Sequence, residues 1–209
     1  MSCVNVLKVG LLLGSARTSG NCAGLEKWLL QRLQTSPNMT QETGFEFVNI
    51  YPNAPVHPLG PVSDEVIPAM VPADGSYTLD KVNEWSKIVK SCNAFIILTP
   101  QYNWGYPGDL KNALDHLYYE WRGKPVMVVT YGGHGGEKCG SQLRQVLSGL
   151  RMKVVEDTVS ITLPEEYIRT SARLRAEDFE TLETNPKFAF LVEAEESLGR
   201  AFENLKAAI

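Results

Sequence analysis

The chain has 209 residues, of which 44% are hydrophobic and 21% are charged, and its formal net charge at pH 7 is −4. A chain of this length and composition buries a globular core without metal or disulfide support. The acidic excess lies in residues 165–209, and no basic stripe could hold phosphate backbones, so we expect no nucleic acid partner. No apolar run reaches the roughly 18 residues of a membrane span, so we expect no membrane association.

The spacing of the cysteines and histidines indicates neither disulfide bonds nor a structural metal site. The four cysteines are scattered without a CxxC pair, and none of the three histidines lies at zinc-ligand spacing from another ligand. We therefore expect free thiols in a reducing compartment, a cytoplasmic location and no metal site.

Five short apolar runs predict the strands of a sheet. Each has about the length of a buried strand, and three are nearly continuous in apolar residues, as parallel sheets require. The five runs are Lys8–Leu13, Phe45–Ile50, Ala94–Thr99, Pro125–Tyr131 and Lys153–Val159.

Between these runs lie segments whose apolar residues recur at helical spacing. They predict helices around residues 25–33, 82–89, 110–121 and 143–150, and a last helix that begins at Asn185-Pro186, a good N-cap and first-turn pair. Strands and helices that alternate along the whole chain predict one doubly wound α/β domain over residues 1–209.

Two segments break this alternation. Residues 52–72 contain six of the twelve prolines, which predicts a long irregular excursion that covers a site or a partner. Leu163–Leu182 carries Arg169, Arg173 and Arg175 with little periodicity, and we expect a surface connection there.

In an open parallel sheet, ligands bind beyond the carboxyl ends of the strands, where the strand order reverses. The loop after the first predicted strand, residues 14–21, combines small residues, hydroxyls and one arginine with a helix N-terminus, which together favour a phosphate. It has neither the GK[ST] of a Walker loop nor a GxGxxG, and the alternative is a plain turn with a helix cap. Its candidate ligands are Ser15, Arg17, Ser19 and Asn21.

Aromatic and amide side chains gather after the third predicted strand. Aromatic rings offer stacking area, and amides together with backbone N–H groups can hydrogen-bond to the edge of a heterocycle. The alternative is a rigid loop whose aromatic rings pack on neighbouring elements. The candidate residues are Pro100, Gln101, Tyr102, Asn103 and Trp104.

A glycine-rich loop follows the fourth predicted strand, and its backbone can approach a flat ligand closely. Its candidate residues are Gly132, Gly133, His134 and Gly135, with His134 either reactive or merely hydrogen-bonded. The three loops together describe a phosphorylated planar ring compound, as flavin mononucleotide (FMN) is. No GxSxG elbow and no Cys-x5-Arg loop supports a hydrolase or phosphatase.

These residues also carry a family resemblance. The NAD(P)H-dependent FMN reductase family has a signature that resembles residues 99–107 (TPQYNWGYP) together with Leu110–Ala113 and Asp115. The resemblance covers roughly residues 8–160. Gly14, Ser15 and Arg17 match the family's phosphate loop, whereas many relatives place the next serine and asparagine one residue later than Ser19 and Asn21.

The resemblance implies a flavodoxin-like three-layer α/β sandwich, with a five-stranded parallel sheet of order 2-1-3-4-5 and helices on both faces. It implies non-covalent FMN, NADPH or NADH as electron donor, and quinones or free flavins as acceptors in a ping-pong cycle without a catalytic acid or base. It also implies a homodimer or homotetramer. Aromatic residues suggest where its interface lies, and they are Tyr106, Tyr118, Tyr119 and Trp121.

Two other functional classes remain open from the sequence. A flavodoxin-like electron carrier would bind the same cofactor without a pyridine nucleotide site, although carriers are usually more acidic than residues 1–164 of this chain. A redox-sensing interaction protein could use the proline-rich segment to contact a partner.

Overall fold

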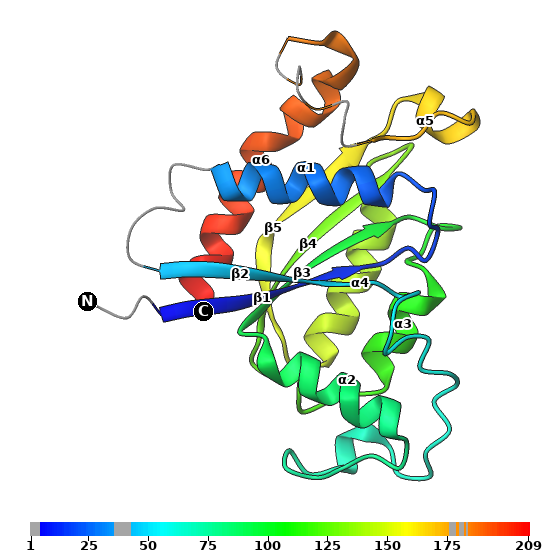
Figure 1. Ribbon diagram of the computed structural model, residues 1–209, viewed down its shortest axis with the longest axis vertical. Helices are drawn as coiled ribbons and strands as arrows, with labels where there is room; N and C mark the ends of the chain where they lie inside the picture. Colours follow the sequence, from blue (N-terminus) through cyan, green and yellow to red (C-terminus); the bar gives the residue numbers. More distant parts are fainter. Residues whose placement is uncertain (1–4, 36–42, 176–178, 180–181, 183) are drawn as a thin grey trace.

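The computed structural model describes residues 5–35, 43–175, 179, 182 and 184–209, and a five-stranded sheet lies at its centre (Figure 1). All strands run parallel in the order β2-β1-β3-β4-β5. Both the predicted strands and the predicted order are therefore confirmed. The strands are β1 (Asn5–Leu13), β2 (Thr43–Ile50), β3 (Ala94–Pro100), β4 (Pro125–Gly132) and β5 (Lys153–Thr162).

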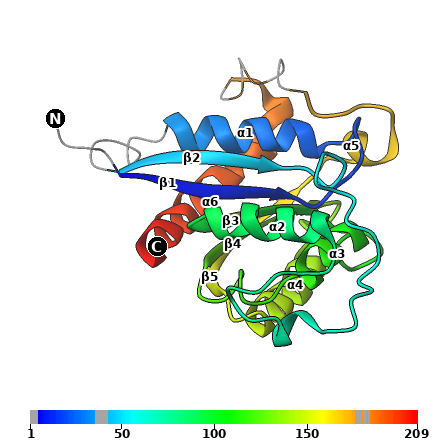
Figure 2. The same cartoon turned by 60° about the horizontal axis from the view of Figure 1, so that its bottom comes forward.

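Helices cover both faces of the sheet and complete a three-layer sandwich (Figures 1 and 2). One face carries α1 (Cys22–Thr35) and α6 (Ala189–Ala208). The other face carries α2 (Asp80–Ser91), α3 (Gly108–Asp115) and α4 (Glu137–Gly149).

The side chains of each buried strand alternate between the two cores, because successive residues of a strand point to opposite faces. In β3, Ile96 and Leu98 pack in the core beneath α1 and α6, whereas Phe95 and Ile97 pack in the core beneath α2, α3 and α4. This double burial explains why the apolar run that predicts β3 is continuous rather than alternating.

The helix predicted over residues 110–121 is shorter than expected. Helix α3 ends at Asp115, and tight turns follow, in which the backbone N–H of Trp121 donates to the Tyr118 carbonyl at 3.2 Å. Trp121 is nevertheless fully buried, and its Nε1 donates to the Leu114 carbonyl at 3.2 Å. Beyond Asp115, the helical spacing of the apolar residues therefore correctly predicts that they are buried, but not that the helix continues.

The proline-rich segment, residues 52–72, is irregular as predicted, apart from the short 3-10 helix η2 (Pro68–Met70). It packs on α2 and α3 through buried apolar side chains, among them Leu59. The Gly60 carbonyl oxygen accepts a hydrogen bond from Asn112 Nδ2 at 2.8 Å and lies 3.0 Å from His116 Nε2. The segment is thus fastened to the side of the sheet that lies opposite α1.

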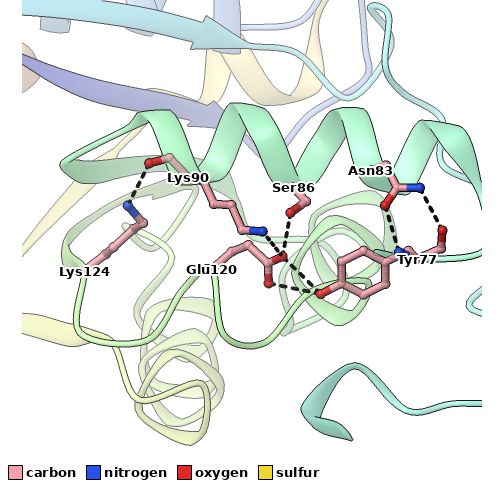
Figure 3. A network of polar contacts seen from close by, with 6 residues as sticks. All are labelled: Tyr77, Asn83, Ser86, Lys90, Glu120 and Lys124. Atoms are coloured by element: carbon pink, nitrogen blue, oxygen red, sulfur yellow. Dashed lines mark hydrogen bonds and ion pairs between the residues drawn. The ribbon is translucent and has the colours of Figure 1, made fainter. Parts of the chain in front are cut away.

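Just after this segment, Tyr77 is hydrogen-bonded to the buried carboxylate of Glu120 (Figure 3). The Tyr77 hydroxyl donates to both oxygens of Glu120, at 3.2 and 3.0 Å, and Ser86 Oγ donates to Oε1 at 2.6 Å. Lys90 Nζ lies 3.7 Å from the same carboxylate, whose side chain is 2% exposed. Burial and the Glu120 charge raise the pKa of the Tyr77 hydroxyl, so the tyrosine stays a donor at neutral pH.

The prediction that Leu163–Leu182 is a surface connection was wrong. The segment begins with a short helix, α5 (Glu165–Arg169), and several of its described side chains are buried in the core beneath α1 and α6. The arginines of the segment and the irregular spacing of its apolar residues give no sequence pattern that predicts this burial. The buried residues are Leu163, Tyr167, Leu174, Phe179 and Leu182.

The N-cap predicted at Asn185 is present. Its side-chain oxygen accepts a hydrogen bond from the Lys187 N–H at 3.1 Å, and the 3-10 turn η4 (Pro186–Phe188) leads into α6. In the described part of the chain, no helix is long and apolar enough to cross a membrane, and no group of His, Cys, Asp or Glu is arranged to hold a metal ion.

Candidate functional site

A cavity of about 530 Å³ opens beyond the carboxyl ends of β1, β3 and β4, at the edge where sequence reasoning places the ligand. Strand β1 lies between β2 and β3, so the connection after β1 runs to one side of β1 and the connection after β2 crosses to the other side. The strand order therefore reverses between β1 and β3. The lining comes from five stretches of the chain: residues 15–21, 100–102, 131–133, 163 with 167–168, and 173.

The loop after β1 forms one end of this cavity. Ser15 is buried, and its hydroxyl lies 3.1 Å from the Tyr102 hydroxyl and accepts the Arg17 N–H at 3.4 Å. Arg17 extends its guanidinium over the Tyr102 ring, with Cζ 4.9 Å from the ring centroid. The loop leads into the N-terminus of α1, so its backbone N–H groups, hydroxyls and arginine form an anion-binding end.

Asn21 closes the loop after β1 and ties it to the segment after β5. Its Nδ2 donates to the Tyr167 carbonyl at 2.9 Å, and its Oδ1 accepts the Leu174 N–H at 3.0 Å. Ser19 also lines the cavity and is exposed. Asn21 therefore contributes by fixing the segment across from the loop as well as by lining the cavity.

The loop after β3 contributes Pro100, Gln101 and Tyr102 to the cavity wall. The Gln101 N–H donates to the Tyr131 carbonyl at 3.0 Å, and its Oε1 accepts the Cys139 N–H at 3.2 Å. These bonds to β4 and α4 hold the loop rigid.

Asn103 and Trp104 do not line the cavity. Tyr102 and Gly105 exchange backbone hydrogen bonds of 2.8 and 2.9 Å, and the two residues between them form a hairpin tip with φ of 47° and 73°. Positive φ is unfavourable for a bulky residue such as Trp104, which is 68% exposed. The Lys138 ammonium lies 5.5 Å from the centroid of its ring.

Only part of the glycine loop after β4 lines the cavity wall. Gly132 and Gly133 line the cavity, whereas His134 and Gly135 do not. Gly135 adopts a φ of 67° and is buried, with its carbonyl accepting from Thr130 Oγ1 at 2.7 Å; His134 is exposed. The tight turn therefore presents its first two residues to the cavity.

Sequence reasoning missed several lining residues. Tyr131 is the last residue of a predicted strand, and that position at the carboxyl end of β4 was the signal for it. The others, apart from small neighbours in the loop after β1, come from the segment after β5, for which the sequence predicts a surface connection. They are Leu163, Tyr167, Ile168 and Arg173.

The described lining of the cavity carries positive charge and no carboxylate, histidine or lysine. Among the described residues that line it, Arg17 and Arg173 are the only charged side chains. Burial raises the pKa of the Tyr131 hydroxyl well above its usual range and that of the neighbouring Cys22 thiol to about 11. Burial also raises the pKa of Cys139, beneath the loop after β3, to about 12. These groups are neutral at physiological pH, so the site can bind an anion but offers no thiolate.

Residues 7–165 match the sequence model of the family described as NADPH-dependent FMN reductase. The chain belongs to this family. The NAD(P)H-dependent FMN reductase LOT6 of Saccharomyces cerevisiae is 40% identical in an alignment of 169 residues that covers 78% of this chain and 87% of the yeast protein. The family resemblance is thus confirmed, and this FMN reductase family member is an oxidoreductase.

Two further likenesses are weaker. A quinone reductase of Escherichia coli is 40% identical in an alignment of 65 residues that covers 28% of this chain and 35% of that protein. FerB, a flavoenzyme NAD(P)H:(acceptor) oxidoreductase from Paracoccus denitrificans, has 18% identity and a TM-score of 0.51, and the match covers 93% of this chain and 98% of that chain. At this identity the likeness shows the shared fold.

The cavity of this FMN reductase family member fits the cofactor named by its family. FMN joins a flat ring to a terminal phosphate, and 530 Å³ lies within the range of roughly 300–1,000 Å³ typical of cofactor sites. The loop after β1, with its hydroxyls and Arg17, suits the phosphate. The backbone of residues 100–102 and 132–133 suits a flat ring, because neither Gly132 nor Gly133 carries a side chain that would keep the ring away.

Proposed function

We propose that the protein is an FMN-dependent NAD(P)H oxidoreductase that reduces quinones or free flavins. The observation that carries this proposal is the cavity at the reversal of strand order, which has two arginines and no carboxylate among its described lining residues. Such a site attracts the phosphate of a flat redox cofactor and leaves the redox chemistry to that cofactor.

The residues of the cavity are assigned to binding rather than to acid–base chemistry. Ser15, Arg17, Ser19 and Asn21 hold the phosphate end of FMN. The wall that faces the ring consists of Pro100, Gln101, Tyr102, Gly132 and Gly133. FMN held there would supply the redox chemistry, which is hydride acceptance from NADPH or NADH and delivery of two electrons to the acceptor, while these residues bind and orient it.

Asn103, Trp104, His134 and Gly135 lie outside the cavity lining, so their contact with FMN stays a prediction. Among them, Trp104 presents a large exposed ring at the hairpin tip, and we expect a flat acceptor to contact that ring. Flat acceptors are also suggested by the quinone reductase of Escherichia coli, which resembles part of this chain.

Donor and acceptor are expected to bind in turn, because both must stack on the same ring in one shallow cavity. Initial rates measured at several fixed quinone concentrations should give parallel double-reciprocal plots against NADPH, as a ping-pong cycle does. Intersecting lines would require a ternary complex, and with it a second binding site next to the ring.

We also propose that the protein assembles as a homodimer or homotetramer through α3 and the turns that follow it. Tyr106, just before α3, and Tyr118 and Tyr119, in the turns after it, are half-buried, and aromatic residues are enriched in interface cores. Trp121 is excluded from this surface because it is fully buried in the core. Light scattering at micromolar concentration should show at least a dimer; a monomer would contradict the proposal.

A cytoplasmic location is part of the same proposal. Cys22, Cys92 and Cys139 are buried and unpaired, which suits a reducing compartment.

A further inference from the structure

The segment after β5 brings a second arginine to the cavity from outside the region that the family model covers. The family match ends at residue 165, and Arg173 lies beyond it. In the fold, however, Arg173 lines the same cavity as residues 15–21. The cavity wall is thus completed by a part of the chain that the family assignment leaves without a role.

The backbone around Arg173 is fixed against the loop after β1. The next residue, Leu174, donates its N–H to Asn21 Oδ1 at 3.0 Å. Leu174 also packs on the first turn of α1, where a Cβ on Gly24 would lie 2.5 Å from the Leu174 carbonyl oxygen. Glycine at position 24 therefore permits an approach that a side chain would prevent, and Arg173 is held beside the anion-binding end.

The Arg173 guanidinium is oriented by its own segment. Its Nη1 donates to the Thr170 carbonyl at 2.7 Å and to the Ala172 carbonyl at 2.5 Å. A guanidinium has five N–H donors, so those on Nε and Nη2 remain for a ligand. Within the described residues, neither Arg173 nor Arg17 forms an ion pair with a carboxylate, so both charges are available to an anion.

We propose that Arg173 is a second phosphate-binding residue and that, together with Arg17, it makes the cavity selective for FMN over flavins that lack the phosphate. This proposal rests on the proposed function. A phosphate monoester carries a charge of about −1.5 to −2 at neutral pH, which one arginine alone does not balance. Two arginines that line the same cavity match that charge and supply several N–H donors to the phosphate oxygens.

The test compares FMN with riboflavin, because the two share the ring and differ only in the phosphate. The full-length protein, freed of flavin, is titrated with each ligand, and quenching of the flavin fluorescence is followed. Arg173→Gln should weaken FMN binding about tenfold, the loss expected for a charge-assisted contact, and leave riboflavin binding unchanged. Arg173→Lys, which keeps the charge, should retain most of the preference for FMN.

A matched control is available in the same segment. Arg169 is exposed, pairs with Glu165 at 2.8 Å and does not line the cavity, so Arg169→Gln should bind both flavins as the wild type does. An equal loss of FMN and riboflavin affinity in Arg173→Gln would show a structural role and overturn the proposal.

Two other outcomes would also overturn it. The first is an unchanged ratio of FMN to riboflavin affinity in Arg173→Gln. The second is a rise in the KM for NADPH but not for NADH while FMN affinity stays constant, because the arginine would then serve the phosphate of the electron donor. If the wild type bound neither flavin, the proposed function itself would fail, and the assignment of Arg173 with it.

Discussion

Replacing Arg17 with alanine is expected to weaken FMN binding about 10- to 100-fold, while the protein stays folded. The guanidinium stands at the anion-binding end of the cavity, exposed and over the Tyr102 ring, and no carboxylate of the described residues competes for it. A charge-assisted hydrogen bond to phosphate is worth roughly 1.5–3 kcal/mol, which corresponds to this range of affinity. Fluorescence titration of the flavin-free protein with FMN measures the effect.

Arg122→Ala provides the comparison, because Arg122 is also exposed but does not line the cavity. Its FMN affinity should equal that of the wild type. An unchanged affinity in Arg17→Ala would return the loop after β1 to the simpler interpretation, a turn with a helix cap.

Trp121→Ala is expected to lower the free energy of unfolding by about 3–5 kcal/mol, the usual cost of removing a large buried aromatic side chain. Trp121 is fully buried, with ring centroids 5.0 Å from Phe95 and 5.8 Å from Trp85. Its removal also leaves the Leu114 carbonyl without the indole donor. Chemical denaturation followed by circular dichroism measures the loss.

Tyr119 provides a contrast only two residues away. It is half-buried and stacks edge-on with Tyr118, so Tyr119→Ala should cost about 1 kcal/mol or less in unfolding free energy. If Trp121→Ala instead kept full stability and only lost its oligomeric state, the core assignment of Trp121 would be wrong.

The sheet could be predicted from the sequence because a strand that is buried on both faces forms a recognisable apolar run. The runs that predict β1, β3 and β4 are nearly continuous in apolar residues, and only a strand between two helical layers needs that. Helical spacing predicted burial equally well but helix length less well. Leu117 and Trp121 continue the apolar spacing past Asp115, although the backbone there has already turned.

The candidate site could be predicted in part, because the fold fixes which loops meet. Loops at the carboxyl ends of neighbouring parallel strands converge whatever their composition, so Arg17, Tyr102 and Gly133 could be placed together from strand order alone. Which residues of each loop face inward depends on local turns. The hairpin at Tyr102–Gly105 puts Asn103 and Trp104 at its tip, and no pattern in the sequence signals that direction.

The segment after β5 could not be placed from the sequence. Its contact with the loop after β1 depends on hydrogen bonds between residues about 150 positions apart, such as the one from Leu174 to Asn21. Such pairings leave no periodicity in the chain. Arg173 was visible as a residue of that segment, but its position at the cavity follows only from the tertiary packing.

The most direct test of the central claim is the absorbance of the purified, FMN-reconstituted protein before and after anaerobic mixing with NADPH or NADH. An FMN-dependent NAD(P)H oxidoreductase should show the yellow absorbance of bound flavin, lose it within seconds of mixing, and recover it when a quinone is added. Flavin that migrates as FMN on chromatography should be released on denaturation. A protein that retains no flavin, or whose bound flavin stays oxidised with both nucleotides, would contradict the account.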